Sequence, residues 1–215
     1  MSRIKMKNVI ISALMVLLAV SGANASQKSG CELSQTGALE VSWTGYKTEK
    51  KVGVGGVFDS VFYTSVAKSG ENFHSILVGS SVVIDTSSVN SKNEGRDEKL
   101  AKFFFGMMSD KNINAKIVDI KADKRVKDVP RTGVVSVEIE MNGVKKTVPM
   151  TYSFGHDIFE AKGVIDILDF SASNALSSIN KACFDLHEGK TWSEAGIGFK
   201  TKIEAILCKV EPLKQ

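Results

Sequence analysis

Apolar and polar residues alternate with a period of two along several segments of the chain. An early segment covers residues 39–44, and a late one places Ile197, Phe199 and Ile203 on one parity. Side chains two residues apart lie on the same face of a strand, so each segment predicts a strand with one buried face. Clusters of β-branched, aromatic and glycine residues predict further strands over residues 52–66, 73–84, 113–124 and 157–165.

A hairpin over residues 134–154 is the strongest of these predictions. Apolar residues from Val135 to Met141 alternate with polar ones, and Asn142-Gly143 follows them. This dipeptide tolerates the positive φ angles of a two-residue hairpin turn. The return strand carries large apolar side chains on one parity: Val144, Val148, Met150, Tyr152 and Phe154.

Two segments have helical spacing instead. Asn93 is a typical N-cap ahead of residues 96–108, in which Leu100 and Phe104 lie one helical turn apart. A second helix is predicted over residues 173–187. The fold class is therefore mainly β, with about eight mostly antiparallel strands and two helical inserts. Their continuous apolar face must be covered in a closed barrel or in a two-sheet sandwich, and composition does not choose between these.

The first 25 residues resemble a signal peptide. Three basic residues precede an apolar run over residues 9–20, which is too short to span a membrane as a helix, and the small residues 23–25 follow. We expect cleavage after Ala25, a single mature domain over residues 26–215, and a periplasmic or secreted location. Lys28 stands where a lipid-attachment site before Cys31 would need an apolar residue, so no stable membrane anchor is expected.

Composition narrows the class of protein. The 215 residues are 43% hydrophobic and 24% charged, which excludes a disordered chain and a multi-span membrane protein. The formal net charge of +4 falls to +1 once the three basic residues of the leader are removed. No basic stripe remains, so nucleic acid is not an expected partner.

The three cysteines predict one disulfide and one free thiol in an oxidising compartment. Cys183 continues the helical stripe of Leu176 and Ile179, which favours a buried core position. That leaves Cys31 and Cys208 as the expected pair, at the two ends of the mature chain. A bridge between Cys183 and Cys208 is the main alternative.

No catalytic or metal-binding pattern stands out. The sequence has no Gly-x-Ser-x-Gly elbow, no His-Glu-x-x-His and no P-loop, and its three histidines and three cysteines lack the spacing of metal ligands. The glycines at 53, 55 and 56 are interpreted as bends in a curved strand rather than a dinucleotide loop. We therefore expect no enzyme activity, no metal and no cofactor.

Large apolar residues that share one face of their strands are the sequence feature that bears on ligand binding. Trp43, Met141, Met150 and Phe199 all lie on the apolar faces of their strands. Such a face is needed for an ordinary packed core, and aromatic side chains mixed with flexible Met would also suit a long apolar ligand. Periodicity alone does not separate these two interpretations.

Motifs along most of the mature chain resemble the YceI-like family of exported, lipocalin-like, polyisoprenoid-binding proteins. Residues 56–58 are similar to its Gly-x-Phe, and residues 83–89 to its strand followed by Thr-Ser-Val. Residues 96–100 with the following phenylalanines resemble its Arg-Asp-x-His-Leu helix, although Lys99 stands at the usual His. Residues 141–148 match its hairpin and residues 161–170 its late strand. A helical insertion at about 171–196 departs from the family pattern.

The resemblance implies an extended eight-stranded antiparallel lipocalin-like barrel around an apolar tunnel. It implies a periplasmic carrier or store for a polyisoprenoid, a quinone or a fatty amphiphile. The alternative is a structural or stress-response barrel filled by its own side chains. The helix at 96–108 would form a mouth, with Arg96 or Lys99 at a polar or anionic head group; an ion pair of Arg96 with Asp97 or Glu98 is the competing interpretation.

The ligand-binding residues expected from parity and from this resemblance are Trp43, Phe58, Phe103, Phe104, Met107, Ile139, Met141, Met150, Tyr152, Phe154, Phe199 and Ile203. The expected partner is one lipophilic small molecule with an isoprenoid or fatty chain. A homodimer is compatible with the sequence, which does not determine the oligomeric state.

Overall fold

The structure is a computed structural model that describes residues 32–206. The predicted leader, its cleavage site after Ala25, and the cysteines Cys31 and Cys208 lie outside the described residues. Within them, no helix is both long and apolar enough to cross a membrane.

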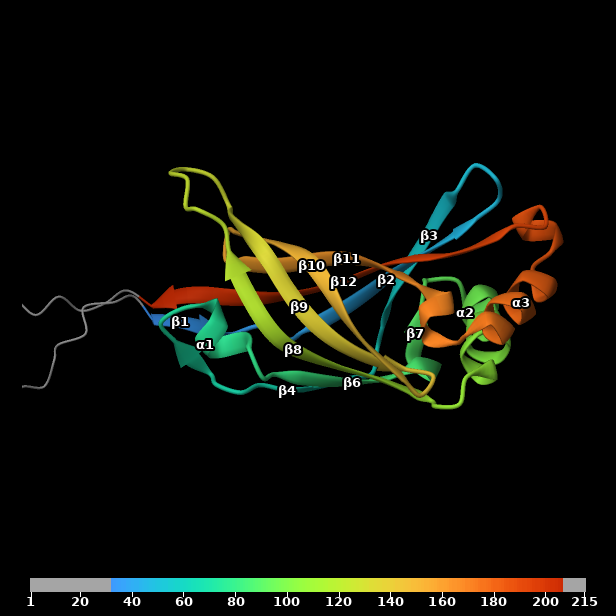
Figure 1. Cartoon of the computed structure of the whole chain (residues 1–215), viewed down its shortest axis with the longest axis horizontal. Coiled ribbons are helices and arrows are strands. Elements are labelled where there is room, and N and C mark those ends of the chain that lie inside the picture. Colours follow the sequence, from blue (N-terminus) through green and yellow to red (C-terminus); the bar gives the residue numbers. More distant parts are fainter. Residues whose placement is uncertain (1–31, 207–215) are drawn as a thin grey trace, which may run out of the picture.

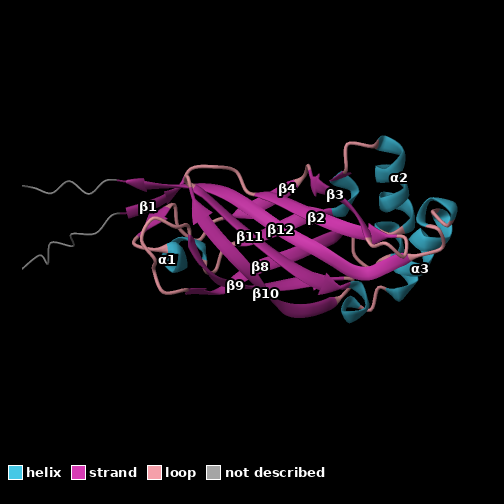
Figure 2. Ribbon diagram, turned by 90° about the horizontal axis from the view of Figure 1, so that it is seen from above, coloured by secondary structure: helices cyan, strands magenta, loops and turns pink. Residues whose placement is uncertain are grey.

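The described chain forms one curled antiparallel sheet, drawn out into an elongated half-barrel (Figures 1 and 2). Its main path runs in the order β4-β6-β8-β9-β10-β11-β12-β2-β3-β7, with β1 beside β12 and β5 beside β1. The strands are β1 (Glu32–Gln35), β2 (Glu40–Lys47), β3 (Val52–Phe58), β4 (Val61–Thr64), β5 (Ser69–Gly70), β6 (Ser81–Asp85), β7 (Val89–Asn90), β8 (Asn112–Ala122), β9 (Arg131–Met141), β10 (Val144–Gly155), β11 (Ile158–Asp166) and β12 (Thr191–Ile206).

This architecture confirms the mainly β, lipocalin-like fold class, with twelve strands within residues 32–206 in place of about eight. Part of the difference arises where the glycine-rich residues 52–66 divide into β3 and β4 at Asp59 and Ser60. The two-residue strands β5 and β7 are too short to produce a periodic signal in sequence. Among residues 32–206, no strand ladder joins β4 to β7 at the two ends of the path.

Helices close the two ends of the barrel. Figure 1 shows α1 at one end, beside β1, and α2 and α3 together at the other. The helical elements are α1 (Phe73–Leu77), α2 (Glu94–Phe103), α3 (Ser173–Ala182) and the 3₁₀ turns η1 (Thr86–Ser88), η2 (Phe105–Met107), η3 (Ile167–Phe170) and η4 (Asp185–His187).

The prediction of a strand throughout residues 73–84 is wrong, because α1 precedes β6 there. Asn72 and Ser75 form a capping box, in which the Asn72 side chain accepts from the Ser75 backbone and the Ser75 hydroxyl accepts from the Asn72 backbone. The buried residues Phe73, Ile76 and Leu77 recur at i, i+3 and i+4, which is a helical spacing. The sequence therefore contained a local signal for this helix.

The predicted hairpin is present as β9 and β10. Asn142 and Gly143 have φ angles of +53° and +72°, as the tight turn requires. Val148 lies opposite Val137, and Met150 opposite Val135, with all four side chains buried. The alternation predicted for this pair therefore identifies its inward face correctly.

Asn93 caps α2 as predicted, accepting a hydrogen bond from the Arg96 backbone at 3.0 Å. The second helix is shorter than predicted, because α3 ends at Ala182 and the separate turn η4 follows. Strand β12 begins at Thr191, so the helical part of the insertion ends before 196.

Candidate functional site

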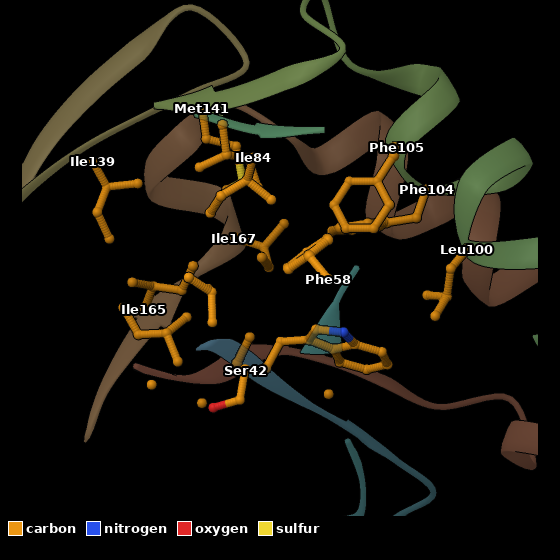
Figure 3. A pocket seen from close by; sticks show the side chains of 18 of the residues that line it. Ser42, Phe58, Ile84, Leu100, Phe104, Phe105, Ile139, Met141, Ile165 and Ile167 are labelled. Atoms are coloured by element: carbon orange, nitrogen blue, oxygen red, sulfur yellow. The ribbon is translucent and has the colours of Figure 1, made fainter. Parts of the chain in front are cut away.

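The half-barrel contains a partly open cavity of about 620 Å³ at the end where α2 and α3 lie. This volume lies within the range of about 300–1,000 Å³ usual for small-molecule sites. Figure 3 shows Leu100, Phe104 and Phe105 reaching into it from the α2–η2 side, and Ile139, Met141 and Ile165 from the opposite side.

Aromatic side chains form the wall near α2. The rings of Phe58 and Phe105 meet edge to face with centroids 5.8 Å apart. The indole nitrogen of Trp43 donates to the Val57 carbonyl at 3.4 Å, which satisfies its one polar atom and leaves the ring as apolar wall. An apolar chain in this space would therefore meet no unpaired group on Trp43.

The structure places seven of the twelve predicted site residues on the cavity wall. These are Trp43, Phe58, Phe104, Ile139, Met141, Met150 and Phe199. Their inward direction follows from strand parity, except for Phe104, which caps the C-terminal end of α2.

The other five predicted residues do not line this cavity. Tyr152, Phe154 and Ile203 lie on inward faces but belong to the packed region around α1. Phe103 lies on α2 beside Lys102, whose Nζ is 5.1 Å from the ring centroid. Met107 is 51% exposed, because α2 ends at Phe103 and the turn η2 changes the helical phase that the sequence pattern had extended.

Much of the cavity wall consists of residues that were not predicted from the sequence. The insertion supplies part of it, because Leu176, Ile179 and Cys183 of α3 face the cavity. Their amphipathic stripe was visible, but sequence spacing did not show which part of the sheet it would cover. The buried thiol of Cys183 is free, as predicted. Further apolar lining comes from Leu39, Val41, Val82, Ile84, Ile113, Ile117, Val137, Ile165, Ile167 and Ile197.

The opposite end of the barrel is filled by its own side chains. Phe73 of α1 contacts Tyr152, Phe154 and Phe159 with ring centroids 5.9, 4.9 and 5.1 Å away. Burial raises the pKa of Tyr152, whose hydroxyl has no hydrogen-bond partner among the described residues. Tyr152 therefore belongs to this packed end and does not present its hydroxyl to the cavity.

Charged side chains lie at the rim of the cavity near α2 and η4. Lys47, Arg96, Lys99 and Glu194 all contribute to the lining. The Glu194 carboxylate is 2.7 Å from the Lys51 ammonium. Burial, followed by the nearby positive charges of Lys47 and Lys99, lowers the pKa of His187 below its ordinary value of 6.5.

The site offers shape and apolar surface rather than reactive groups. Across the described part of the chain, no group of three or more His, Cys, Asp or Glu side chains is arranged to hold a metal ion. A partly open apolar space with a few charged side chains in its lining is the arrangement expected for binding an amphiphilic molecule.

Comparison with known proteins agrees with this geometry. The family model described as a YceI-like domain matches residues 35–203. A polyisoprenoid binding domain from Saccharophagus degradans, implicated in plant cell wall breakdown, has a similar structure, with a TM-score of 0.53 and 15% identity. The alignment covers 82% of this chain and 99% of that domain.

A second solved structure, BcnA of Burkholderia cenocepacia, aligns with a TM-score of 0.50 and 16% identity, over 77% of this chain and 96% of the other. At these identities the two structures establish a shared fold. No curated protein matches the chain.

Proposed function

This chain belongs to the YceI-like family, and from that premise we propose that it is an exported protein that binds one long-chain apolar molecule in its barrel. The ligand classes are a polyisoprenoid, a quinone or a fatty amphiphile, which the protein carries or stores. The similar domain from Saccharophagus degradans is described as polyisoprenoid binding, which supports this choice.

The observation that carries the proposal is the cavity of about 620 Å³. A barrel filled by its own side chains would have no such space, since protein interiors are close-packed. Each CH₂ group of a ligand transferred from water into this space would contribute about 0.8 kcal/mol. Affinity for a long chain therefore requires no strong polar contact.

The packed end around Phe73 supports the self-filled alternative for that half of the barrel only. Phe73 and Phe159 occupy the space between the sheet walls there. The proposal accordingly assigns the ligand to the α2–α3 end and a structural role to the α1 end. Binding rather than turnover is the proposed activity, because retention of an apolar chain uses no reactive side chain.

Export is proposed from the leader over residues 1–25. An apolar molecule cannot cross an aqueous compartment unshielded, so a barrel that encloses it would serve as a carrier between membranes. Detecting a mature N-terminus at Ser26 in the periplasm or the medium would support this location, and an intact Met1 in the cytoplasm would contradict it.

The experiment that tests the function is native mass spectrometry of protein purified gently from its own host, with organic extraction of the same sample. We expect one apolar molecule per chain. After extraction, the protein should take up the lipophilic dye Nile red at one site. If no stoichiometric molecule is recovered and no dye is taken up, the binding proposal is wrong and the protein is a structural barrel.

A further inference from the structure

Basic side chains from three separate elements meet at the rim of the cavity. Lys47 is the last residue of β2, Arg96 and Lys99 belong to α2, and His187 ends η4. All four line the cavity and are partly buried. The positive charges of Lys47 and Lys99 both act on the His187 ring, so these three side chains lie near one another although their elements are far apart in sequence.

Arg96 and Lys99 are three residues apart and so share one face of α2. Leu100, the next residue, also lines the cavity. The same face of the helix thus presents an apolar side chain to the interior and two cationic side chains beside it. This arrangement matches a ligand with an apolar chain and a charged head.

Acidic partners for these cations are missing within residues 32–206. No described acidic side chain forms an ion pair with Lys47, Arg96 or Lys99. Asp97, one of the two acidic residues that the competing interpretation pairs with Arg96, accepts from the Ser91 backbone at 2.9 Å. Glu194 is paired with Lys51. Positive charge is therefore left in a partly desolvated place, where an anion would be favoured.

The His187 ring is held with one nitrogen available. Its Nδ1 lies 2.7 Å from Thr191 Oγ1, and that hydroxyl donates to Asn180 Oδ1 at 2.8 Å. Because the Thr191 proton is committed to Asn180, Nδ1 is the donor to Thr191. Nε2 has no hydrogen-bond partner among the described residues, so it can take a proton when an anion approaches.

Resting on the proposed function, we infer that the ligand carries an anionic head group, a carboxylate or a phosphate monoester, held at the rim by Arg96, Lys99 and Lys47 beside His187. Among the proposed ligand classes this selects fatty acids and isoprenyl phosphates over neutral quinones and alcohols. Burial at the rim strengthens each charge-assisted hydrogen bond relative to one in water.

Displacement of Nile red from the extracted, full-length mature protein tests the inference with probes that share one chain. Oleic acid and oleyl phosphate supply the two anionic heads, and oleyl alcohol supplies the neutral one. At a pH where both acids are ionised, the anions should displace the dye at concentrations at least about tenfold below that of the alcohol, as expected for one or more charge-assisted hydrogen bonds. The ratio between the two anions identifies the preferred head.

Lys99→Met should remove most of this preference by weakening displacement by the two anions, while displacement by oleyl alcohol should change much less. Lys102→Met is the matched control, because Lys102 is an exposed residue of the same helix that does not line the cavity. Lys99→Arg keeps the charge and should retain the preference. Circular dichroism of Lys99→Met, compared with Lys102→Met, establishes whether the variant is folded.

Titration of His187 by NMR gives a second readout. Saturating oleate should raise the pKa of His187, because a nearby anion favours the imidazolium, whereas oleyl alcohol should not. Equal displacement by oleate and oleyl alcohol would overturn the anionic head while leaving the apolar-binding proposal intact. Equal loss of preference in Lys99→Met and Lys102→Met would also overturn it. Failure of all three probes to displace bound dye would overturn the inference, because neither anionic chain would then bind at the dye site; the binding proposal itself fails only if the protein takes up no dye and yields no extracted molecule.

Discussion

Phe73 of α1 packs edge-on against Phe159 of β11, with ring centroids 5.1 Å apart and ring planes at 65°. This contact joins the helix at one end of the barrel to the sheet wall. Ile76 and Leu77 of the same helix are completely buried beneath it. The barrel is consequently solid at the α1 end and hollow at the α2–α3 end.

Phe73→Ala should lower the free energy of unfolding by about 3–5 kcal/mol, since it removes a buried aromatic side chain and leaves a cavity. Urea unfolding followed by circular dichroism measures this. Phe62→Ala is the control, because Phe62 is 66% exposed on β4. If both substitutions lower the free energy of unfolding by a similar small amount, α1 is not packed tightly against the sheet.

Phe199 separates the hollow end from the solid end. Its ring lines the cavity and stacks on Phe159 with centroids 6.0 Å apart. Phe199→Ala should deepen the cavity and shift the preferred ligand towards longer chains. Dye displacement by a series of fatty acids of increasing length measures the shift. An unchanged length preference would show that Phe199 does not limit the depth of the cavity.

Met150→Lys should abolish dye uptake, because Met150 is 3% exposed and lines the cavity, where a cationic side chain would be desolvated. Thr151→Lys places the same charge on the exposed opposite face of β10. It should leave dye uptake nearly intact, with a small loss of stability from Lys162 directly opposite. Equal loss of uptake in both variants would contradict the assignment of faces.

His187 should make stability depend on pH. Its pKa is lowered in the folded protein by burial and by Lys47 and Lys99, so the unfolded chain binds the proton more readily. Stability is therefore complete above about pH 6.5, decreases as the pH falls through this value, and stops decreasing below the lowered pKa.

His187→Asn keeps a side-chain N–H donor for Thr191. Urea unfolding of this variant at a series of pH values should show a free energy of unfolding that no longer decreases below about pH 6.5. His74→Asn on the exposed side of α1 is the control and should retain the decrease. Identical profiles for His187→Asn and the unaltered protein would assign the pH dependence to other groups.

Cys31 and Cys208 are predicted to form a disulfide, although both lie outside the described residues. The neighbouring residues Glu32 and Ile206 are paired between β1 and β12. Cys183 lies on the cavity wall as the C-cap of α3, and Figure 1 shows α3 at the opposite end of the molecule from β1. In the chain-entropy model, a disulfide between Cys31 and Cys208 would close a long loop and contribute about 4–5 kcal/mol to the free energy of unfolding.

Non-reducing peptide mapping of the exported protein should therefore yield a peptide that links Cys31 to Cys208, with Cys183 as a free thiol. A peptide that links Cys183 to either of the others, or three free thiols, would refute the pairing.

Local patterns were sufficient for most strands and for the ends of some elements. The alternation around Val137 and Ile139, the Asn142-Gly143 turn and the Asn93 cap were all predictable, because each depends on residues within one turn or one strand. The α1 helix was predictable in principle from its capping residue and spacing, but its five residues gave only a short signal.

The division of the inward face into cavity and core was not predictable in this way. Met150 and Tyr152 are two residues apart on the same face of β10, yet Met150 lines the cavity and Tyr152 packs against Phe73. Strand parity assigns both to the interior and says nothing about what lies opposite each of them. That depends on where α1 enters the barrel.

The sequence by itself determined a mainly β chain with known inward faces, because side-chain direction in a strand follows from local geometry. Only the tertiary structure decided that α3 covers the hollow end and that Lys47, Lys99 and His187 meet at its rim. Such juxtapositions join residues more than 50 positions apart in the chain, from Lys47 to Lys99 and from Lys99 to His187. They depend on the long-range packing of helices against the sheet, which no local periodicity records.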